Sequence, residues 1–297
     1  MDISIIVPHR DSLTTLPRLL NSIPESPSIE VIIIDNSDKP ICKELILSKR
    51  AFKLLYSSPS LYAGGARNKG LDNASGKWII FADADDFFDE EAFNLFQKYI
   101  ESKYDLIYFG MRGVYSDDLS PSTRGQRYTQ LIHKYLNSEI NEMELRLSFD
   151  TPCSKMVRRS LVEKHHIRFD EVVASNDTYF SLLAGYYAES FIAEEYPVYV
   201  ATISKTSTVN RRDYTATKSR YLVALRKNKF LKEHGCKSMQ TSVMIYLFKS
   251  LKLGPKVLFE FVGFLFKYRQ NLFIGYKNWI NTAVNIIRTN KNKNKHK

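Results

Sequence analysis

The stretch Lys77-Trp78-Ile79-Ile80-Phe81-Ala82-Asp83-Ala84-Asp85-Asp86 carries most of the information about the fold. Its first half is apolar enough for a strand that is buried on both faces of a sheet. Three aspartates follow where the chain leaves that strand. Ligands of open α/β sheets bind at the carboxyl ends of the strands. This stretch therefore predicts a polar binding site at the end of a buried strand.

Apolar, β-branched segments alternate with helix-like segments over the first third of the chain. The predicted strands are Ile3–Val7, Val31–Ile34, Phe52–Tyr56, Trp78–Ala82 and Leu106–Phe109, and the predicted helices are Thr14–Ser22, Ile41–Ser48, Ala66–Asn73 and Glu90–Glu101. This alternation is typical of a mostly parallel sheet with helices on its faces. We therefore expect an α/β fold with a Rossmann-like central sheet.

The alternation weakens after Gly113, and the later elements are predicted one by one. They are a polar loop or lid at Tyr115–Arg127, a helix-like stretch at Tyr128–Leu147, a helix at Asp177–Tyr187, strands at Phe191–Ala193 and Val198–Ile203, and helices at Tyr214–Glu233 and within Ser242–Arg288. The Lys/Asn-rich tail Asn290–Lys297 is expected to be disordered.

Composition and charge narrow the class of protein. The chain has 297 residues and 44% apolar content, enough for one large core with a smaller appendage. Its three cysteines are too few and too scattered for a disulfide framework or a zinc site. No signal peptide is visible at the start, so we expect a cytoplasmic protein. The net charge of +11 is uneven, because residues 205–297 contain 21 Lys/Arg against 3 Asp/Glu.

The aspartates Asp83, Asp85 and Asp86 are candidates for binding a metal ion. Carboxylates this close together repel one another, and a divalent cation such as Mg²⁺ or Mn²⁺ relieves that repulsion. Such an ion would in turn bind phosphates. The alternative is an acidic turn whose aspartates cap a helix that starts near Asp89.

Polar residues at the other predicted strand ends suggest a nucleotide site. Asp35 ends the second strand, where nucleotide-binding sheets often present a carboxylate to a base or ribose. In Ala63–Gly70 the glycines allow close backbone approach, and Arg67 offers a planar donor set for a diphosphate or nucleoside. Further along, Asp177 is either a general base or only the N-cap of its helix.

These segments occur together in one order and spacing. They are Ser4-Ile-Ile-Val-Pro8, Val31-Ile-Ile-Ile-Asp35, Ala63-Gly-Gly-Ala-Arg-Asn-Lys-Gly70 and Ala74-Ser-Gly-Lys-Trp-Ile-Ile-Phe-Ala-Asp-Ala-Asp-Asp86. The set resembles the N-terminal half of family 2 glycosyltransferases. The stretches Ser154–Glu171 and Asn176–Phe180 resemble the acceptor side of bacterial members that build capsular, exopolysaccharide or lipopolysaccharide glycans. The resemblance covers about residues 3–205.

The resemblance implies a GT-A fold and an inverting sugar transfer. The donor would be a nucleotide-diphosphate sugar, with a UDP-sugar expected, and the acceptor a hydroxyl of a glycan or lipid-linked glycan. The resemblance assigns nucleotide-sugar contacts to Pro8, Arg10, Asp35, Gly64, Arg67, Asp83 and Ala84. It also implies that Asp85 ligates Mn²⁺ or Mg²⁺ and that Asp177 deprotonates the acceptor. Such a single displacement needs one base and a Lewis acid.

The chain departs from the family pattern at several positions. His9-Arg10-Asp11 stands where Tyr-Asn is usual, and Asn36 and Asn176 stand where acids are usual. Cys153-Ser154 replaces a common Trp-Asn pair. These departures bear on the nucleotide base and on the acceptor that the protein prefers.

The predicted domains follow from the resemblance and the charge. Residues 1–205 form a GT-A catalytic domain, with a nucleotide-sugar half over about 1–112 and an acceptor half over about 113–205. Residues 206–289 form a basic, aromatic, helical C-terminal region, and 290–297 the disordered tail.

The C-terminal region is expected to lie on an anionic membrane surface on the cytoplasmic face of the inner membrane. Its cations Lys249, Lys252, Lys256, Lys267, Arg269 and Lys277 alternate with apolar residues and Trp279. The alternative is a helical subdomain that packs on the catalytic domain. Nucleic acid is not expected as a partner, because no recognition motif accompanies the charge.

Two other functions remain open. One is nucleotidyl transfer onto a sugar phosphate, which would release pyrophosphate from a nucleoside triphosphate. The other is a glycosyltransferase-like domain that binds without turnover, suggested by the unusual Pro8–Asp11 segment and by Asn176.

Overall fold

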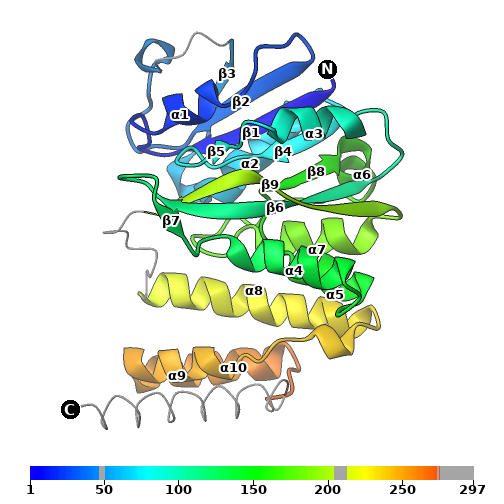
Figure 1. The fold of residues 1–297 in the computed structure, drawn as a ribbon. Helices are drawn as coiled ribbons and strands as arrows, with labels where there is room; N and C mark the ends of the chain where they lie inside the picture. The colour runs from blue at the N-terminus through cyan, green and yellow to red at the C-terminus, as the bar shows by residue number, and fades with distance from the viewer. Residues whose placement is uncertain (47–50, 204–212, 273, 275–297) are drawn as a thin grey trace, which may run out of the picture. The chain divides into compact units, whose positions relative to one another are not determined.

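The computed structural model of the protein describes residues 1–46, 51–203, 213–272 and 274 (Figure 1). The chain divides into two compact units, Met1–Val209 and Asn210–Lys297. The predicted tail 290–297, and with it Lys277 and Trp279, lies outside the described residues.

The first unit is built on one sheet, which has nine strands among the described residues. Its order is β3-β2-β1-β4-β8-β6-β9-β5, with β7 beside β6. The strands are β1 (Ile3–His9), β2 (Ile29–Asp35), β3 (Lys53–Tyr56), β4 (Trp78–Phe81), β5 (Phe87–Phe88), β6 (Leu106–Tyr115), β7 (Pro121–Ser122), β8 (Lys155–Arg158) and β9 (Phe191–Ile203).

The strands β1 to β4 pair in parallel, and β6 pairs in parallel with β9. Strand β8 lies between β4 and β6 and is antiparallel to both. The strands β1 to β4 on one side of it therefore run in the same direction as β6 and β9 on the other. Buried apolar side chains fill β1, β2 and β4. The predicted α/β architecture with a mostly parallel sheet is confirmed.

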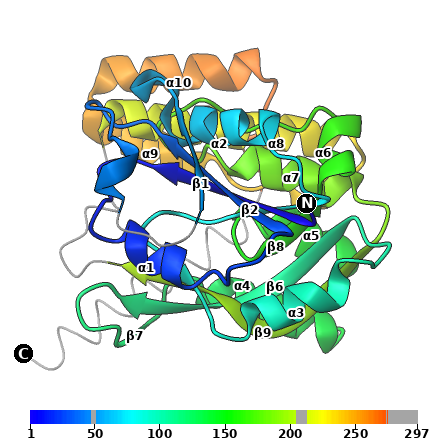
Figure 2. The same cartoon turned by 90° about the horizontal axis from the view of Figure 1, so that it is seen from above.

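Helices cover both faces of this sheet. They are α1 (Leu16–Asn21), α2 (Tyr62–Asp72), α3 (Ala92–Tyr99), α4 (Gln126–Leu136), α5 (Glu142–Ser148), α6 (Arg159–Lys164) and α7 (Thr178–Tyr187). Figure 2 shows α2 and α6 on one side of the sheet and α1 and α3 on the other.

Several predicted elements differ from those observed. The predicted helix at Ile41–Ser48 is reduced to a short 3₁₀ helix at Lys43–Leu45 within the described part of that segment. The stretch Tyr128–Leu147 is two helices, because the chain turns through Ser138 at φ 59° and Asn141 then caps α5 by accepting from the Glu144 backbone N–H at 2.9 Å. Strand β8 and helix α6 were not predicted.

The two strands predicted near the end of the first unit are one strand, β9. Its register against β6 shifts where Gly110 pairs with Pro197. Proline cannot donate a ladder hydrogen bond, and a bulge accommodates it without ending the strand. The sequence pattern marked this bulge as a break.

The second unit contains the helices α8 (Tyr214–Glu233), α9 (Met244–Leu253) and α10 (Pro255–Lys267). The bounds of α8 match the predicted helix. A small core joins the three helices, in which Tyr221 of α8 stacks on Phe261 of α10 with ring centroids 4.7 Å apart. No helix among the described residues is both long and apolar enough to cross a bilayer.

Candidate active site

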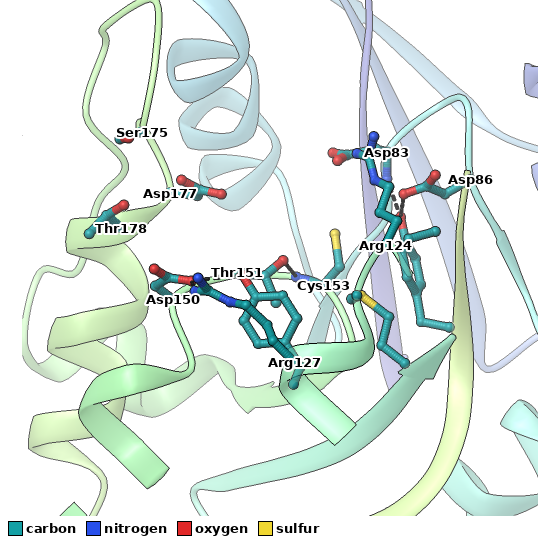
Figure 3. A pocket seen from close by; sticks show the side chains of 15 residues that line it. Asp83, Asp86, Arg124, Arg127, Asp150, Thr151, Cys153, Ser175, Asp177 and Thr178 are labelled. Carbon is teal, nitrogen blue, oxygen red and sulfur yellow. Dashed lines mark hydrogen bonds and ion pairs between the residues drawn. The ribbon is translucent and has the colours of Figure 1, made fainter. Parts of the chain in front are cut away.

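A cavity of about 440 Å³ opens in the first unit at the end of β4 (Figure 3). Its wall combines the loop after β4, the start of α4, the segment before β8, the loop before α7, and β9. The lining residues are Asp83, Asp86, Met111, Arg124, Gly125, Arg127, Tyr128, Asp150, Thr151, Cys153, Ser175, Asp177, Thr178, Tyr199 and Ala201. Residues far apart in sequence therefore meet around one polar space.

The loop Asp83–Asp86 is held in place by strand β9. The Tyr199 hydroxyl donates to Asp86 Oδ2 at 2.8 Å and accepts from the Asp83 backbone N–H at 2.8 Å. The Thr202 backbone N–H donates to Asp86 Oδ1 at 2.7 Å. Asp86 is buried, with both oxygens engaged, so its first role is to fix the loop.

Asp83 is paired with Arg67 of α2. The guanidinium donates to Asp83 Oδ1 at 2.6 Å and to Asn176 Oδ1 at 2.8 Å, and it lies 5.3 Å from the centre of the Phe169 ring. Arg67 is buried, and Asp83 is the partner that compensates its charge. The predicted site residues Arg67 and Asp83 thus lie together, and Asn176 occupies the position where an acid is usual.

Asp85 differs from its two neighbours, because within the described chain its carboxylate accepts no hydrogen bond from another residue. Ligand oxygens of Asp83, Asp85 and Asp86 all lie within 4.8 Å of one another. Burial, and then the charge of Asp83, raise the pKa of Asp85, and burial with its acidic neighbours raises the pKa of Asp86 well above its usual range. Clustered carboxylate oxygens with one uncommitted group fit a hard divalent cation.

Asp177 stands at the N-cap position of α7, yet its side chain makes no capping hydrogen bond. The carboxylate lines the cavity instead (Figure 3). Burial is the main cause that raises its pKa to about 6, with Asp150 adding to the shift and Arg67 opposing it. A carboxylate with such a pKa can accept a proton near neutral pH.

An aromatic cluster brings Asp177 to the end of β4. The Phe169 ring stacks on Phe180 at 4.1 Å and meets Phe81, the last residue of β4, edge-on at 4.9 Å. Such pairs contribute about 0.5–1.5 kcal/mol each beyond the area they bury. Because Phe169 and Phe180 flank the loop that carries Asp177, their packing on Phe81 sets where that carboxylate lies.

Asp150 is a second carboxylate on the same side of the cavity. Its Oδ1 accepts from Arg127 and, at 2.7 Å, from the Tyr128 hydroxyl. Burial lowers the pKa of Arg127, but the charge of Asp150 raises it by more, so the pKa lies above its usual value. Asp150 is thereby anchored to the first turn of α4.

Other predicted nucleotide contacts lie outside this cavity. Pro8 does not form a turn, since it is buried within β1 in register with Ile34. Arg10 is exposed and pairs with Asp38 at 2.9 Å. Asp35 is 2% exposed, and both of its oxygens already accept hydrogen bonds, from His9, Ser37 and the Ile41 backbone. Burial, and not a shortage of acceptor sites, keeps a nucleotide base from Asp35 in this conformation, since Oδ2 accepts from the Ile41 N–H alone among the described residues.

Gly64 lies inside α2, two residues before the predicted start of that helix, and a Cβ there would be 1.9 Å from the Asp170 carbonyl oxygen. Glycine is required at this position because the backbone of Asp170 approaches it closely, where we expected a ligand to do so. Ala84 is also buried, and its carbonyl accepts from the Thr15 hydroxyl at 2.9 Å.

The sequence pattern did not single out Arg124, Arg127, Asp150 or Tyr199 as site residues. Arg124 and Arg127 lie at the end of the segment predicted as a polar loop or lid, which was the available signal. The sequence gave no signal for Tyr199, because its partner Asp86 is 113 positions away in the chain.

Comparisons with known proteins agree on the class. A family model described as "Glycosyl transferase family 2" matches residues 4–165. The poly(ribitol-phosphate) beta-N-acetylglucosaminyltransferase TarS of Staphylococcus aureus is 24% identical over 62% of this chain and 32% of TarS. The protein EpsH of Bacillus subtilis, which carries the description "Putative glycosyltransferase", is 25% identical over 62% of this chain and 55% of EpsH. The chain thus spans less than two thirds of each relative's length.

A solved structure of residues 1–349 of S. aureus TarS in complex with UDP-GlcNAc has the same fold. Its TM-score is 0.59 at 20% identity, over 92% of this chain and 75% of that one. The expected GT-A fold is therefore confirmed. With the family model matching more than half of its residues, the chain belongs to glycosyl transferase family 2.

Proposed function

We propose that the protein transfers a sugar from a nucleotide-diphosphate sugar to a hydroxyl group of a surface glycan or lipid-linked glycan. One observation carries this proposal: a single cavity brings Asp83 and Asp86 of the acidic loop together with the base candidate Asp177 on a family 2 fold. The names of TarS and EpsH support the same activity. The TarS complexes with UDP-GlcNAc and UDP motivate a UDP-sugar as donor.

The donor would bind over the loop after β4. Arg67 donates to Asp83 Oδ1 at 2.6 Å, and because Asp83 lines the cavity, its other oxygen would contact the ribose or sugar. Asp85, helped by Asp83 or Asp86, would hold Mn²⁺ or Mg²⁺, whose charge would neutralise the diphosphate that leaves.

The transfer would be one displacement with inversion at the anomeric carbon. Asp177 takes the proton of the acceptor hydroxyl while the acceptor oxygen forms its bond to the anomeric carbon. The bond from that carbon to the diphosphate oxygen breaks, and its electron pair leaves with the nucleoside diphosphate. The pKa of Asp177, raised to about 6, keeps the carboxylate mostly ionised at pH 7 and still basic enough to accept the proton.

Metal-dependent hydrolysis of a panel of UDP-, GDP- and dTDP-sugars tests the donor side without an acceptor. We expect slow release of one nucleoside diphosphate with Mn²⁺ or Mg²⁺, and loss of that release in Asp85→Ala. A wild-type protein that neither hydrolyses nor binds any of them with metal would refute the proposal. Release of pyrophosphate from a nucleoside triphosphate would instead identify a nucleotidyltransferase.

The second unit would contact the anionic surface of a membrane. Exposed apolar side chains gather on α9 and α10, led by Phe259 and Phe266, which are 76% and 79% exposed. These phenylalanines are seven residues apart and share one face of α10 with Gly263. The exposed cations Lys249, Lys252, Lys256 and Lys267 flank them. Apolar anchors with flanking lysines suit an anionic interface.

Co-sedimentation of the full chain with phosphatidylglycerol-containing vesicles tests this contact. We expect Phe259→Ser/Phe266→Ser to lower the bound fraction several-fold, because each phenylalanine contributes roughly 1.5–3 kcal/mol when it is buried in the membrane interface. Leu136→Ser, at a site that is 50% exposed on α4, is the matched control and should leave the bound fraction unchanged. Equal binding of all three proteins would refute the contact.

A further inference from the structure

The backbone near Arg124 is held firmly against the sheet. Strand β7 pairs with β6 through Gly113 and Ser122, just before Arg124. A Cβ on Gly113 would be 2.3 Å from the Arg124 carbonyl oxygen, so glycine lets this loop approach the strand closely. Arg124 is thus presented to the cavity from a fixed backbone position.

The Arg124 side chain faces the acidic loop after β4. Figure 3 shows it beside Asp83 and Asp86 in the cavity. Burial lowers the pKa of Arg124, and the carboxylates of Asp86, Asp85 and Asp83 raise it by more. Arg124 and the three aspartates of the acidic loop therefore attract one another electrostatically across the cavity.

The Arg124 guanidinium nevertheless forms no ion pair or hydrogen bond among the residues that the structure describes, and only the Arg124 backbone N–H donates, to Ser122 Oγ. The other arginines at the site are committed, since Arg67 pairs with Asp83 and Arg127 with Asp150. A half-buried guanidinium that lines the same cavity as these carboxylates without contacting them leaves room for a group between the two. Such a group must accept hydrogen bonds from the guanidinium on one side. On the other side it must coordinate the metal ion that the carboxylates would hold.

A diphosphate bound to a divalent ion has this chemistry. Its oxygens can accept the forked N–H groups of an arginine while they coordinate a metal held at Asp85. Without the nucleotide, the guanidinium and a bare divalent ion at Asp85 would repel each other. The same residue thus favours the metal and nucleotide together and disfavours the metal alone.

We propose that Arg124 binds the diphosphate of the donor and couples the binding of metal and nucleotide, so that the protein takes them up as a pair. The inference rests on the proposed function and deepens it. The coupling is reciprocal, because the nucleotide must strengthen metal binding by the same factor as the metal strengthens nucleotide binding.

Calorimetry on the full chain tests this with two titrations: Mn²⁺ alone, and nucleoside diphosphate in the presence of Mn²⁺. UDP, GDP and dTDP are compared on the wild type, and the one that binds is used. We expect Arg124→Gln to bind Mn²⁺ alone about threefold or more tighter, because a repelling charge is removed. We expect it to bind the Mn²⁺-nucleotide pair about tenfold or more weaker, because charge-assisted hydrogen bonds are lost.

Two further variants serve as controls. One separates the positive charge of Arg124 from the forked shape of its guanidinium, and the other controls for the loss of one positive charge from the protein. Arg124→Lys keeps the repelling charge, so its affinity for Mn²⁺ alone should stay near that of the wild type, while its nucleotide affinity falls. Lys98→Gln removes one exposed positive charge from α3, away from the cavity, and should change neither affinity.

The inference is overturned if Arg124→Gln weakens both affinities together or changes neither. If that variant does not fold, the wild type decides, because equal Mn²⁺ affinity with and without nucleotide excludes the coupling. These results leave the proposed function standing. A wild type that binds none of the three nucleotides with metal overturns both.

Discussion

The hydroxyl of Tyr199 and the carboxylate of Asp86 form a 2.8 Å hydrogen bond inside the cavity wall. Because the same hydroxyl accepts from the Asp83 backbone N–H, one tyrosine on β9 fixes the geometry of the acidic loop after β4. Asp85, between these two anchored positions, keeps the uncommitted carboxylate. Asp83 and Asp86 therefore fix the loop, while the carboxylate of Asp85 is left to bind a ligand.

Replacing Tyr199 by phenylalanine tests this separation. The change leaves the buried Asp86 without one donor, which should cost about 1–3 kcal/mol in the free energy of unfolding. We also expect weaker Mn²⁺ binding, because the loop that carries Asp85 loses an anchor. Urea unfolding and Mn²⁺ titration measure the two effects. Unchanged values for both would show that Tyr199 is not the anchor.

Replacing Asp177 by asparagine should separate catalysis from stability. Loss of a positioned base lowers the turnover rate by about 10²–10⁴-fold. The melting temperature should stay the same or rise, since Asp177 makes no capping hydrogen bond and its charge is partly buried. Thermal unfolding and a transferase assay measure these quantities. A fall in melting temperature would instead favour a helix-capping role.

The pH dependence of activity should follow Asp177. The base must be ionised, so kcat/KM should fall as the pH decreases through about 6. Asp177→Asn should lack this step in its residual activity. A wild-type profile that is flat between pH 7 and pH 5 would exclude Asp177 as the base.

The contribution of Asp177 to the free energy of unfolding should change with pH in the opposite direction to kcat/KM. The pKa of Asp177 is raised to about 6 from an ordinary 3.8, so the folded state binds more protons than the unfolded state between those values. The contribution of Asp177 to stability therefore increases as the pH falls through that window. The difference in unfolding free energy between wild type and Asp177→Asn, measured from pH 7 to pH 4, isolates this contribution.

A pair of glycine substitutions tests the packing of α2. Gly64→Ala should lower the free energy of unfolding by about 1–3 kcal/mol or more, because its Cβ would collide with the Asp170 carbonyl. Gly263→Ala is the matched control, since no heavy atom lies within 4 Å of a Cβ there. It should stabilise α10 by about 0.5–1 kcal/mol through helix propensity. Calorimetric unfolding of the full chain compares the two.

Much of the fold could be predicted from the sequence, because it depends on local patterns. Apolar β-branched runs marked β1, β2 and β4, and the acidic stretch after β4 marked the ligand end of the sheet. The bulge in β9 could not be read in this way, since Pro197 looks like a break until its pairing with Gly110 is known. The bounds of α2 were also missed, because Gly64 serves a contact with Asp170 that is distant in sequence.

The sequence by itself determined which carboxylates were available and that Asp83, Asp85 and Asp86 follow a buried strand. Only the tertiary structure decided what each one does. Packing of Phe169 and Phe180 on Phe81 carries Asp177 into the cavity, and Tyr199 and Arg67 engage Asp86 and Asp83 so that Asp85 is left uncommitted. Hydrogen bonds and ring contacts act over a few ångströms, so the role of each aspartate depends on neighbours that only folding brings near.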